Sequence, residues 1–192
     1  VGFGARKICD SKAPKYINST ETPFFKKKKE LYGVWEMLLS GQYKKNILIV
    51  EGYFDVLLLF QNDIKNVVST LGTSVSKEHI DFLFTKTREI IFCFDGDLAG
   101  QKAIERAINV CLFSLNENKK ISVVSLDPLY DPDCYIREFG KIKFLNKIYK
   151  SKDIFDYYVF FLSNKYNLYN DNEKSVFSKE IFLRNCSEFV FD

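Results

Sequence analysis

Acidic residues follow three short apolar segments of this chain, each near the point where the segment ends. The segments are residues 47–50, 90–94 and 121–126. The acids that follow them are Glu51, Asp55, Asp95, Asp97, Asp131 and Asp133. Like charges that gather in one place repel one another, raise one another's pKa values and need cations to neutralise them. Because all the donor atoms are oxygens, these residues predict a site for Mg²⁺ or Mn²⁺ and not for zinc.

The segments that carry these acids have the pattern of buried strands. Residues 47–50 read Ile-Leu-Ile-Val, a run that is too short for a helix and typical of a strand covered on both faces. Gly52 leaves room for a phosphate or a metal to approach. In open parallel sheets the ligands bind at the carboxyl ends of the strands. We therefore expect the carboxylates to meet at one edge of one sheet.

Strand and helix patterns alternate from residue 46 onward. We expect helices over residues 53–61, 76–86 and 99–112, with Ser76 as an N-cap, and a further strand over residues 66–70. Such an alternation implies right-handed crossovers and a parallel sheet. The predicted fold class is therefore α/β, with helices flanking a parallel sheet.

The two ends of the chain follow other patterns. Residues 1–23 have the composition of loops, and residues 30–39 have helical spacing directly after four lysines at 26–29. Lysines at a helix N-terminus oppose its dipole, so we weigh a solvated helix start against a role in phosphate contact. Residues 134–190 show helical spacing only. A stripe within them predicts core packing and consists of Phe155, Tyr158, Val159 and Leu162.

The composition is that of a globular protein. Of the 192 residues 46% are hydrophobic, and no apolar run approaches the ~20 residues that cross a bilayer. The length allows one domain and part of another. Net charge is only +3, but lysines at 26–29 and 44–45 precede the acids. We expect a soluble protein with no membrane partner and with a local basic surface.

The cysteines and the single histidine predict structural roles. There are five cysteines, with wide gaps and no Cys-x-x-Cys, which favours reduced thiols in an intracellular setting over disulfides or a zinc site. Cys93 falls inside a predicted strand, where it would act as a small hydrophobic residue. His79 falls inside a predicted helix, and we favour a structural role for it over acid or base catalysis.

Three acidic motifs and their flanking segments resemble a known family. Glu-Gly-Tyr-Phe-Asp at 51–55, Asp-Gly-Asp at 95–97 and Asp-Pro-Asp at 131–133 are similar to the motifs of the Toprim fold, which topoisomerases and primases share. The flanks resemble the catalytic core of bacterial-type, DnaG-like DNA primases. They are Pro-Lys-Tyr-Ile-Asn-Ser at 14–19, Leu-Tyr-Gly at 31–33, Thr-Leu-Gly-Thr at 70–73, Glu-His-Ile at 78–80 and Phe-Cys-Phe-Asp-Gly-Asp at 92–97.

The resemblance implies three parts of the chain. Residues 1–43 would be the end of the N-terminal subdomain of the primase polymerase core, a short α+β piece. Residues 44–134 would be the Toprim domain, and residues 135–192 a C-terminal helical subdomain. The chain starts at Val1 without an initiator methionine, so we expect it to be part of a longer protein. The family's zinc-binding module, the first part of its core and its helicase-binding domain would lie outside these residues.

The resemblance also implies a function. Such a protein is a DNA-directed RNA polymerase, which synthesises short RNA primers for DNA replication by metal-dependent nucleotidyl transfer. Its partners would be a single-stranded DNA template, nucleoside triphosphates and the replicative helicase of the primosome. The lysine bias is typical of an AT-rich genome, so we expect the cytoplasm and nucleoid of a low-GC bacterium or a bacterial-derived organelle such as a plastid.

Site residues follow from the matched motifs. The catalytic acids implied are Glu51, Asp95 and Asp97. The metal site would use all six carboxylates, with Mg²⁺ or Mn²⁺ as the cofactor and zinc confined to the module outside this chain. The residues implied to face the template or the incoming nucleotide are Arg6, Lys15, Tyr16 and Lys27.

Three alternatives remain open from the sequence. A Toprim topoisomerase would share the acids but would need a nucleophilic tyrosine in another domain. A phosphatase of the haloacid dehalogenase type also places Asp-x-Asp after a strand, although Ala99 stands where that family has Thr. The third alternative is a non-catalytic module that binds DNA or a partner.

Overall fold

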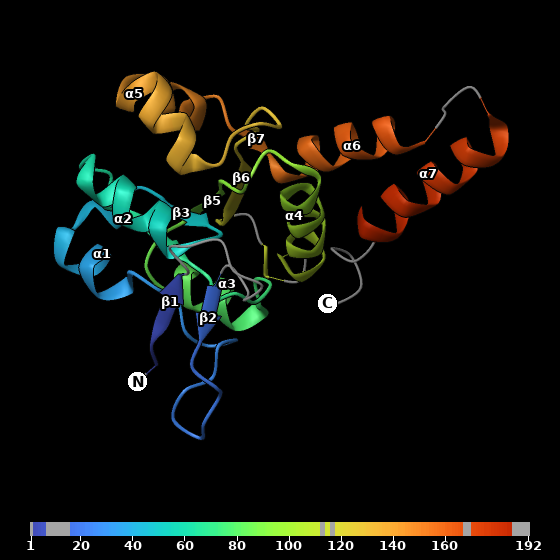
Figure 1. The fold of residues 1–192 in the computed structure, drawn as a ribbon. Coiled ribbons are helices and arrows are strands. Elements are labelled where there is room, and N and C mark those ends of the chain that lie inside the picture. Colours follow the sequence, from blue (N-terminus) through green and yellow to red (C-terminus); the bar gives the residue numbers. More distant parts are fainter. Residues whose placement is uncertain (1, 7–15, 112–113, 116–117, 167–169, 186–192) are drawn as a thin grey trace.

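The chain forms a five-stranded sheet with helices on both faces (Figure 1). The computed structural model describes residues 2–6, 16–111, 114–115, 118–166 and 170–185. In spatial order the strands are β4 (Val67–Ser69), β3 (Ile47–Val50), β5 (Glu89–Phe92), β6 (Lys120–Val123) and β7 (Lys152–Asp153). The first four are parallel, as the alternation of strand and helix predicts. Their carboxyl ends therefore lie at one edge of the sheet.

The fifth strand, β7, departs from the prediction. It runs antiparallel to β6, with Ser122 opposite Asp153. The expectation that residues 134–190 are helical throughout is wrong at this point. A strand of two residues is too short to produce a recognisable periodicity in the sequence. Helices make up the surrounding described segments: α5 (Pro132–Tyr149), α6 (Ile154–Lys165) and α7 (Asp171–Asn185). Gly140, with a φ of 79°, kinks α5.

Alternate residues of the strands pack into two separate cores. Ile47 and Ile49 face the core that contains α3 (Lys77–Phe84), α4 (Leu98–Cys111) and α6. Leu48 and Val50 face the core that contains α2 (Tyr53–Gln61) and α5. This burial on both faces explains why residues 47–50 are apolar without a break. Figure 1 shows α2 and α5 on one side of the sheet and α4 on the other.

The first α-helix begins later than the sequence predicts. The expected helix over 30–39 is α1 (Val34–Ser40), followed by the 3-10 helix η1 (Gln42–Lys44). Tyr32 instead pairs with Ser69 at the edge of the sheet, and Gly33 then takes a φ of 85° that only glycine adopts without strain. The lysines at 26–29 are therefore not at a helix N-terminus, and the argument from the helix dipole is wrong.

Helix α3 fixes the backbone of the lysine segment, residues 26–29. Ser76 is the N-cap of α3, as predicted, and its hydroxyl also donates to the Lys28 carbonyl at 2.5 Å. His79 is fully buried, and its Nε2 lies 3.1 Å from the carbonyl oxygens of both Lys27 and Glu30. Its Nδ1 accepts from the Ser76 backbone N–H. The prediction of a structural histidine is confirmed.

A two-stranded hairpin lies beside the carboxyl edge of the sheet. Its strands are β1 (Gly4–Arg6) and β2 (Tyr16–Asn18), which are antiparallel. The Asn18 side chain joins the hairpin to the sheet, because its Nδ2 donates to the Leu71 carbonyl at 2.9 Å and its Oδ1 accepts from the Tyr53 hydroxyl at 2.9 Å. The hairpin is thus held against the loop after β4 and the start of α2.

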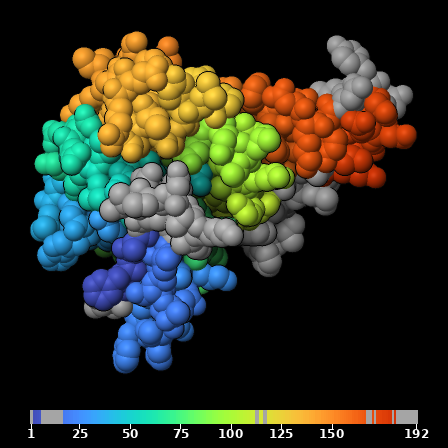
Figure 2. Space-filling model, in the orientation of Figure 1, coloured from blue at the N-terminus to red at the C-terminus, as the bar shows by residue number. Residues whose placement is uncertain are grey.

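The last two helices project from the rest of the molecule, as Figure 2 shows in orange and red. On α6, Tyr158 and Leu162 are buried as predicted, whereas Val159 is 42% exposed and Tyr157 packs in the core instead. In the part of the chain that the structure describes, no helix has the length and apolarity needed to cross a membrane.

The described cysteines are free thiols. Cys93 is fully buried in the core, as predicted, and Cys111 is also buried, whereas Cys134 is exposed. Cys9 and Cys186 lie outside the described residues.

Candidate active site

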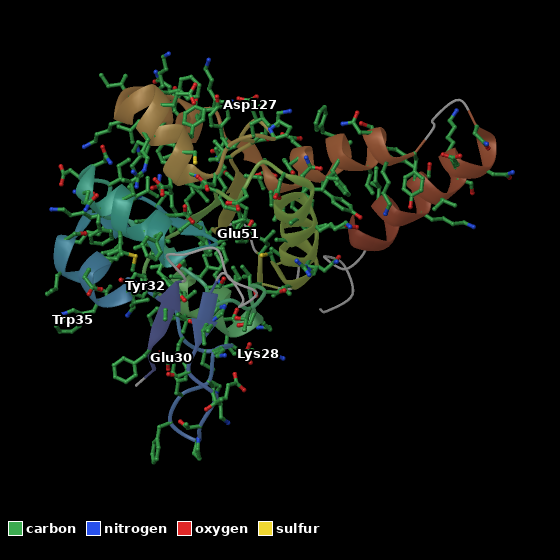
Figure 3. All side chains as sticks on the ribbon, viewed as in Figure 1. Lys28, Glu30, Tyr32, Trp35, Glu51 and Asp127 are labelled. Atoms are coloured by element: carbon green, nitrogen blue, oxygen red, sulfur yellow. The ribbon has the colours of Figure 1, made fainter. Side chains whose placement is uncertain are left out.

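Five of the six predicted acids line one hollow at the carboxyl edge of the sheet. Its volume is about 200 Å³. The five are Glu51, Asp55, Asp95, Asp131 and Asp133. Figure 3 shows Glu51 at the centre of the molecule, where the sheet, α4 and the β1–β2 hairpin come together. The three segments thus bring their acids to a common place, as the strand pattern predicts. We call this space the acidic hollow.

Asp97 lies beside the acidic hollow rather than in its wall. Its side chain is exposed, and Oδ1 accepts from the Gly100 backbone N–H at 2.8 Å in the first turn of α4. Its charge nevertheless contributes to the raised pKa of Asp95. The sequence placed Asp97 correctly at the strand end but could not show that its carboxylate turns toward the helix.

Two acidic loops are held together by their backbones. The Gly96 N–H donates to the Tyr130 carbonyl at 2.9 Å. A Cβ atom on Gly96 would lie only 2.1 Å from the Asp127 carbonyl oxygen, so no other residue fits there without movement. This close approach fixes Asp95 relative to Asp131.

Most of the carboxylates also accept hydrogen bonds from nearby backbone. Asp55 accepts from the Gly52 N–H at 3.0 Å, and Asp131, the N-cap of α5, accepts from the Cys134 N–H at 2.6 Å. Glu51 Oε1 accepts from the Asp95 N–H at 3.2 Å. The Asp133 carboxylate pairs with Arg137 one turn along α5. Acids are favoured at such helix starts, so local structure and the site use the same residues.

Burial and mutual repulsion raise the pKa values of two of these acids. The pKa of Asp55 rises to about 7, mainly because the side chain is buried and secondarily because Asp131 is close. The pKa of Asp95 also rises to about 7, again mainly through burial, with repulsion by the charges of Glu51 and then Asp55 as the next causes. Both shifts have the direction expected for acids that are buried close to like charges.

The donor set fits a hard divalent cation. The acids of the hollow offer carboxylate oxygen, the ligand that Mg²⁺ and Mn²⁺ prefer, and Asn18 adds an amide oxygen. Within the described residues, however, no three His, Cys, Asp or Glu side chains are already grouped as ligands of one ion. Asp97 and Asp131 instead accept hydrogen bonds from backbone N–H groups at helix starts, and Asp133 pairs with Arg137.

The predicted basic residues are described only in part. Lys15 lies outside the described residues, as do the side chains of Arg6 and Tyr16. Lys27 is half-buried; its backbone N–H donates to Glu21 Oε1 at 2.9 Å. Sequence reasoning missed Asn18 as a residue that lines the acidic hollow, although it falls within the quoted 14–19 segment.

Comparisons with known proteins place this geometry in a family. A model of the Toprim domain matches residues 45–125, and a model of the N-terminal domain of the DNA primase catalytic core matches residues 1–38. The chain is 44% identical over 175 residues to the DNA primase of Buchnera aphidicola subsp. Baizongia pistaciae. That match covers 91% of this chain and 30% of the relative.

Solved structures agree with the sequence matches. A DNA primase domain from Pseudomonas aeruginosa is 39% identical, with a TM-score of 0.85, and the match covers 92% of this chain and 55% of that one. A DnaG primase catalytic domain bound to single-stranded DNA is 31% identical, also with a TM-score of 0.85, over 95% of this chain and 60% of that one.

The sheet with its acidic rim defines a Toprim-domain protein, as predicted. The chain belongs to the family of bacterial DNA primases, and the topoisomerase alternative is not favoured. It spans about 30% of the length of the first curated relatives that it matches. Use of a divalent metal is general in this family.

Proposed function

We propose that this chain supplies the metal-binding part of the active site of a DNA primase, an enzyme that makes short RNA primers on a single-stranded DNA template. The observation that carries the proposal is the meeting of Glu51, Asp55 and Asp95 with two further acids in one hollow. Sequence similarity to a DNA primase over 91% of the chain supports it. Proposed partners are the template, nucleoside triphosphates and, through a domain outside this chain, the replicative helicase.

The proposed parts of the chain follow the same argument. Residues 1–43 would end the N-terminal subdomain, residues 44–134 would form the Toprim domain and residues 135–192 a helical subdomain. The two family models, at 1–38 and 45–125, support a division near residue 43. We further propose that the protein works at the nucleoid of a low-GC bacterium or in a bacterial-derived organelle.

The reaction requires groups that manage negative charge. A 3′-hydroxyl attacks the α-phosphate of a nucleotide, the bond to the β-phosphate breaks, pyrophosphate leaves and the hydroxyl proton is released. Glu51, Asp95 and Asp97 would hold Mg²⁺ or Mn²⁺, with Asp55, Asp131 and Asp133 completing the set. A divalent cation bound there supplies a Lewis acid that lowers the pKa of the hydroxyl and stabilises the leaving group.

The chain's own residues prepare the site. Asp55 and Asp95 have pKa values of about 7, so near neutral pH they keep part of their protons and must release them to bind a cation. The Gly96 backbone keeps the second and third acidic loops together. Arg6, Lys15, Tyr16 and Lys27 are proposed to contact the template or nucleotide, independently of base sequence and in a salt-dependent way.

Isosteric replacement of the acids tests the proposal in the full-length protein. We expect Glu51→Gln and Asp95→Asn each to lower primer synthesis by roughly a hundredfold or more, because each removes a ligand charge. Asp127→Asn is the matched control, since Asp127 is exposed on a neighbouring loop and pairs with Lys147. Primer synthesis is measured with a single-stranded template and Mg²⁺. Near-normal primer synthesis by either Glu51→Gln or Asp95→Asn, with unchanged melting temperature, contradicts the proposal.

A further inference from the structure

A second hollow opens on the α4 side of Glu51. Its volume is about 330 Å³, and its walls come from the end of β3, the loop after β4 and helix α4. The polar residues that line it are Glu51, Thr70, Thr73, Ser74 and Arg106. Glu51 and Gly72 line this hollow and the acidic hollow alike. The two spaces therefore meet at the first acid of the rim.

The two hollows have opposite chemistry. Carboxylates dominate the first, whereas the second contains only one, Glu51 at the shared border, together with three hydroxyl groups and the Arg106 guanidinium. Arg106 is exposed, and it forms no ion pair with another described residue. A guanidinium with five donors in a planar fork matches the oxygens of a phosphate group. The second hollow is thus suited to an anion, which the acidic hollow would repel.

One hydroxyl in the second hollow lacks a partner. Thr73 Oγ1 is buried and has no hydrogen bond among the described residues. A buried polar atom without a partner is costly, and in native proteins such an atom usually has a ligand, a water or a functional role. This observation is independent of the free Arg106 charge and points to the same place.

We propose that the second hollow binds the two terminal phosphates of a nucleoside triphosphate, and the pyrophosphate after the reaction, through Arg106 and the hydroxyls of Thr70 and Thr73. The assignment rests on the proposed function. Phosphates bound there lie next to Glu51, so the bond to the leaving group is adjacent to the acids that hold the cation. Arg106 would offset the charge that develops on the pyrophosphate.

The test measures binding of pyrophosphate in the presence of Mg²⁺ by calorimetry, with the full-length protein. We expect Arg106→Ala to weaken binding about ten- to a hundredfold, the usual effect of losing a charge-assisted contact. Arg106→Lys should recover part of this, because it keeps the charge but not the fork. Lys102→Ala is the matched control: it removes one positive charge a turn earlier on α4, outside the hollow, and should change binding less than about twofold.

Thr73→Val separates a ligand contact from a merely unsatisfied hydroxyl. If Oγ1 binds phosphate, the valine variant loses about three- to tenfold in pyrophosphate affinity. Unchanged affinity for pyrophosphate in both Thr73→Val and Arg106→Ala overturns the proposal, as does failure of the wild-type protein to bind pyrophosphate. Loss of affinity for single-stranded DNA alone in Arg106→Ala also overturns it, since the hollow would then face the template.

Failure of this inference is distinguishable from failure of the proposed function. Pyrophosphate binding that depends on Arg106, without primer synthesis by the wild-type protein, supports phosphate binding in the second hollow and contradicts the proposed function. If primers are made and the KM for nucleotides is the same in Arg106→Ala and the wild type, only the proposal that the second hollow binds phosphates is contradicted. Unchanged melting temperatures show that the variants fold, and Arg106→Lys replaces Arg106→Ala in this comparison if the alanine variant does not fold.

Discussion

Asp55, Asp97 and Asp131 each accept a hydrogen bond from a backbone N–H at or beside the start of a helix. A short acid at this position is common in proteins for local reasons alone. Here the same helices begin at the carboxyl ends of neighbouring strands, so acids favoured by local structure also gather at the rim. Binding of a cation would draw on side chains that already stabilise the helix starts.

The raised pKa values lead to a prediction about stability. Because the folded protein holds protons on Asp55 and Asp95 up to a pKa of about 7, and the unfolded chain releases them near 4, folding binds protons between these values. Without metal, the free energy of unfolding should therefore fall as pH rises from about 4 to 7. Urea unfolding in EDTA at several pH values measures this.

Comparison with Asp55→Asn isolates the effect. The variant has no titrating carboxyl at position 55, so its stability should fall less between pH 4 and 7 than that of the wild type. The buried His79, whose lowered pKa works in the opposite direction, contributes equally to both proteins. Mg²⁺ should raise the melting temperature of the wild type more at pH 7.5 than at pH 5. An identical pH dependence in both proteins contradicts the assignment.

At the scale of elements, the rim depends on the contact between two loops. We predict that Gly96→Ala lowers the free energy of unfolding by roughly 2 kcal/mol or more, because the new Cβ would meet the Asp127 carbonyl oxygen. Gly41→Ala is the control. Gly41 has a φ of 69° but no atom within 4 Å of the added Cβ, so only backbone strain of about 1 kcal/mol is expected. Denaturant unfolding compares them, and equal losses would contradict the role of loop contact.

Helix α3 fixes the lysine segment through its first turn. Ser76→Ala removes both the N-cap and the bond to the Lys28 carbonyl, and we expect it to cost about 1–2 kcal/mol of unfolding free energy. Ser163→Ala is the comparison, because that exposed hydroxyl makes a single bond to the Phe160 carbonyl within α6. It should cost less than about 0.5 kcal/mol. Thermal unfolding of the two variants decides between a cap and an ordinary surface serine.

For the whole molecule, the fold that positions the acids follows from periodicity and parallel topology. The strand at 47–50 and the acids behind three strands are readable because buried parallel strands are continuous apolar runs. The bridge that Asn18 makes to the loop after β4 and the place of Arg106 in the wall of the second hollow depend on contacts between distant segments. No local pattern encodes these contacts, so the sequence could identify the rim but not its second hollow.

The lysine segment gives a prediction about binding at this scale. Replacing Lys26, Lys28 and Lys29 by Gln should weaken binding of single-stranded DNA and make it less dependent on salt, by about 0.7 in the log–log slope for each lost phosphate contact. The control replaces three exposed lysines of α5, its C-cap and β7: Lys143, Lys150 and Lys152. Fluorescence anisotropy measures the DNA affinity of both sets of variants at roughly 50 to 200 mM salt, a range over which such contacts are increasingly screened. Equal losses of DNA affinity in the two sets of variants would show that binding depends on total charge and would contradict a role of the lysine segment.

Each outer strand of the parallel part of the sheet has a short antiparallel partner. Tyr32 pairs with Ser69 along the free side of β4, and β7 covers the far side of β6. Bare strand edges are templates for pairing with strands of other molecules, which leads to aggregates. Two very short antiparallel segments thus leave the strands of other molecules few backbone groups with which to pair, while the carboxyl edge of the sheet with its acids stays uncovered by strands.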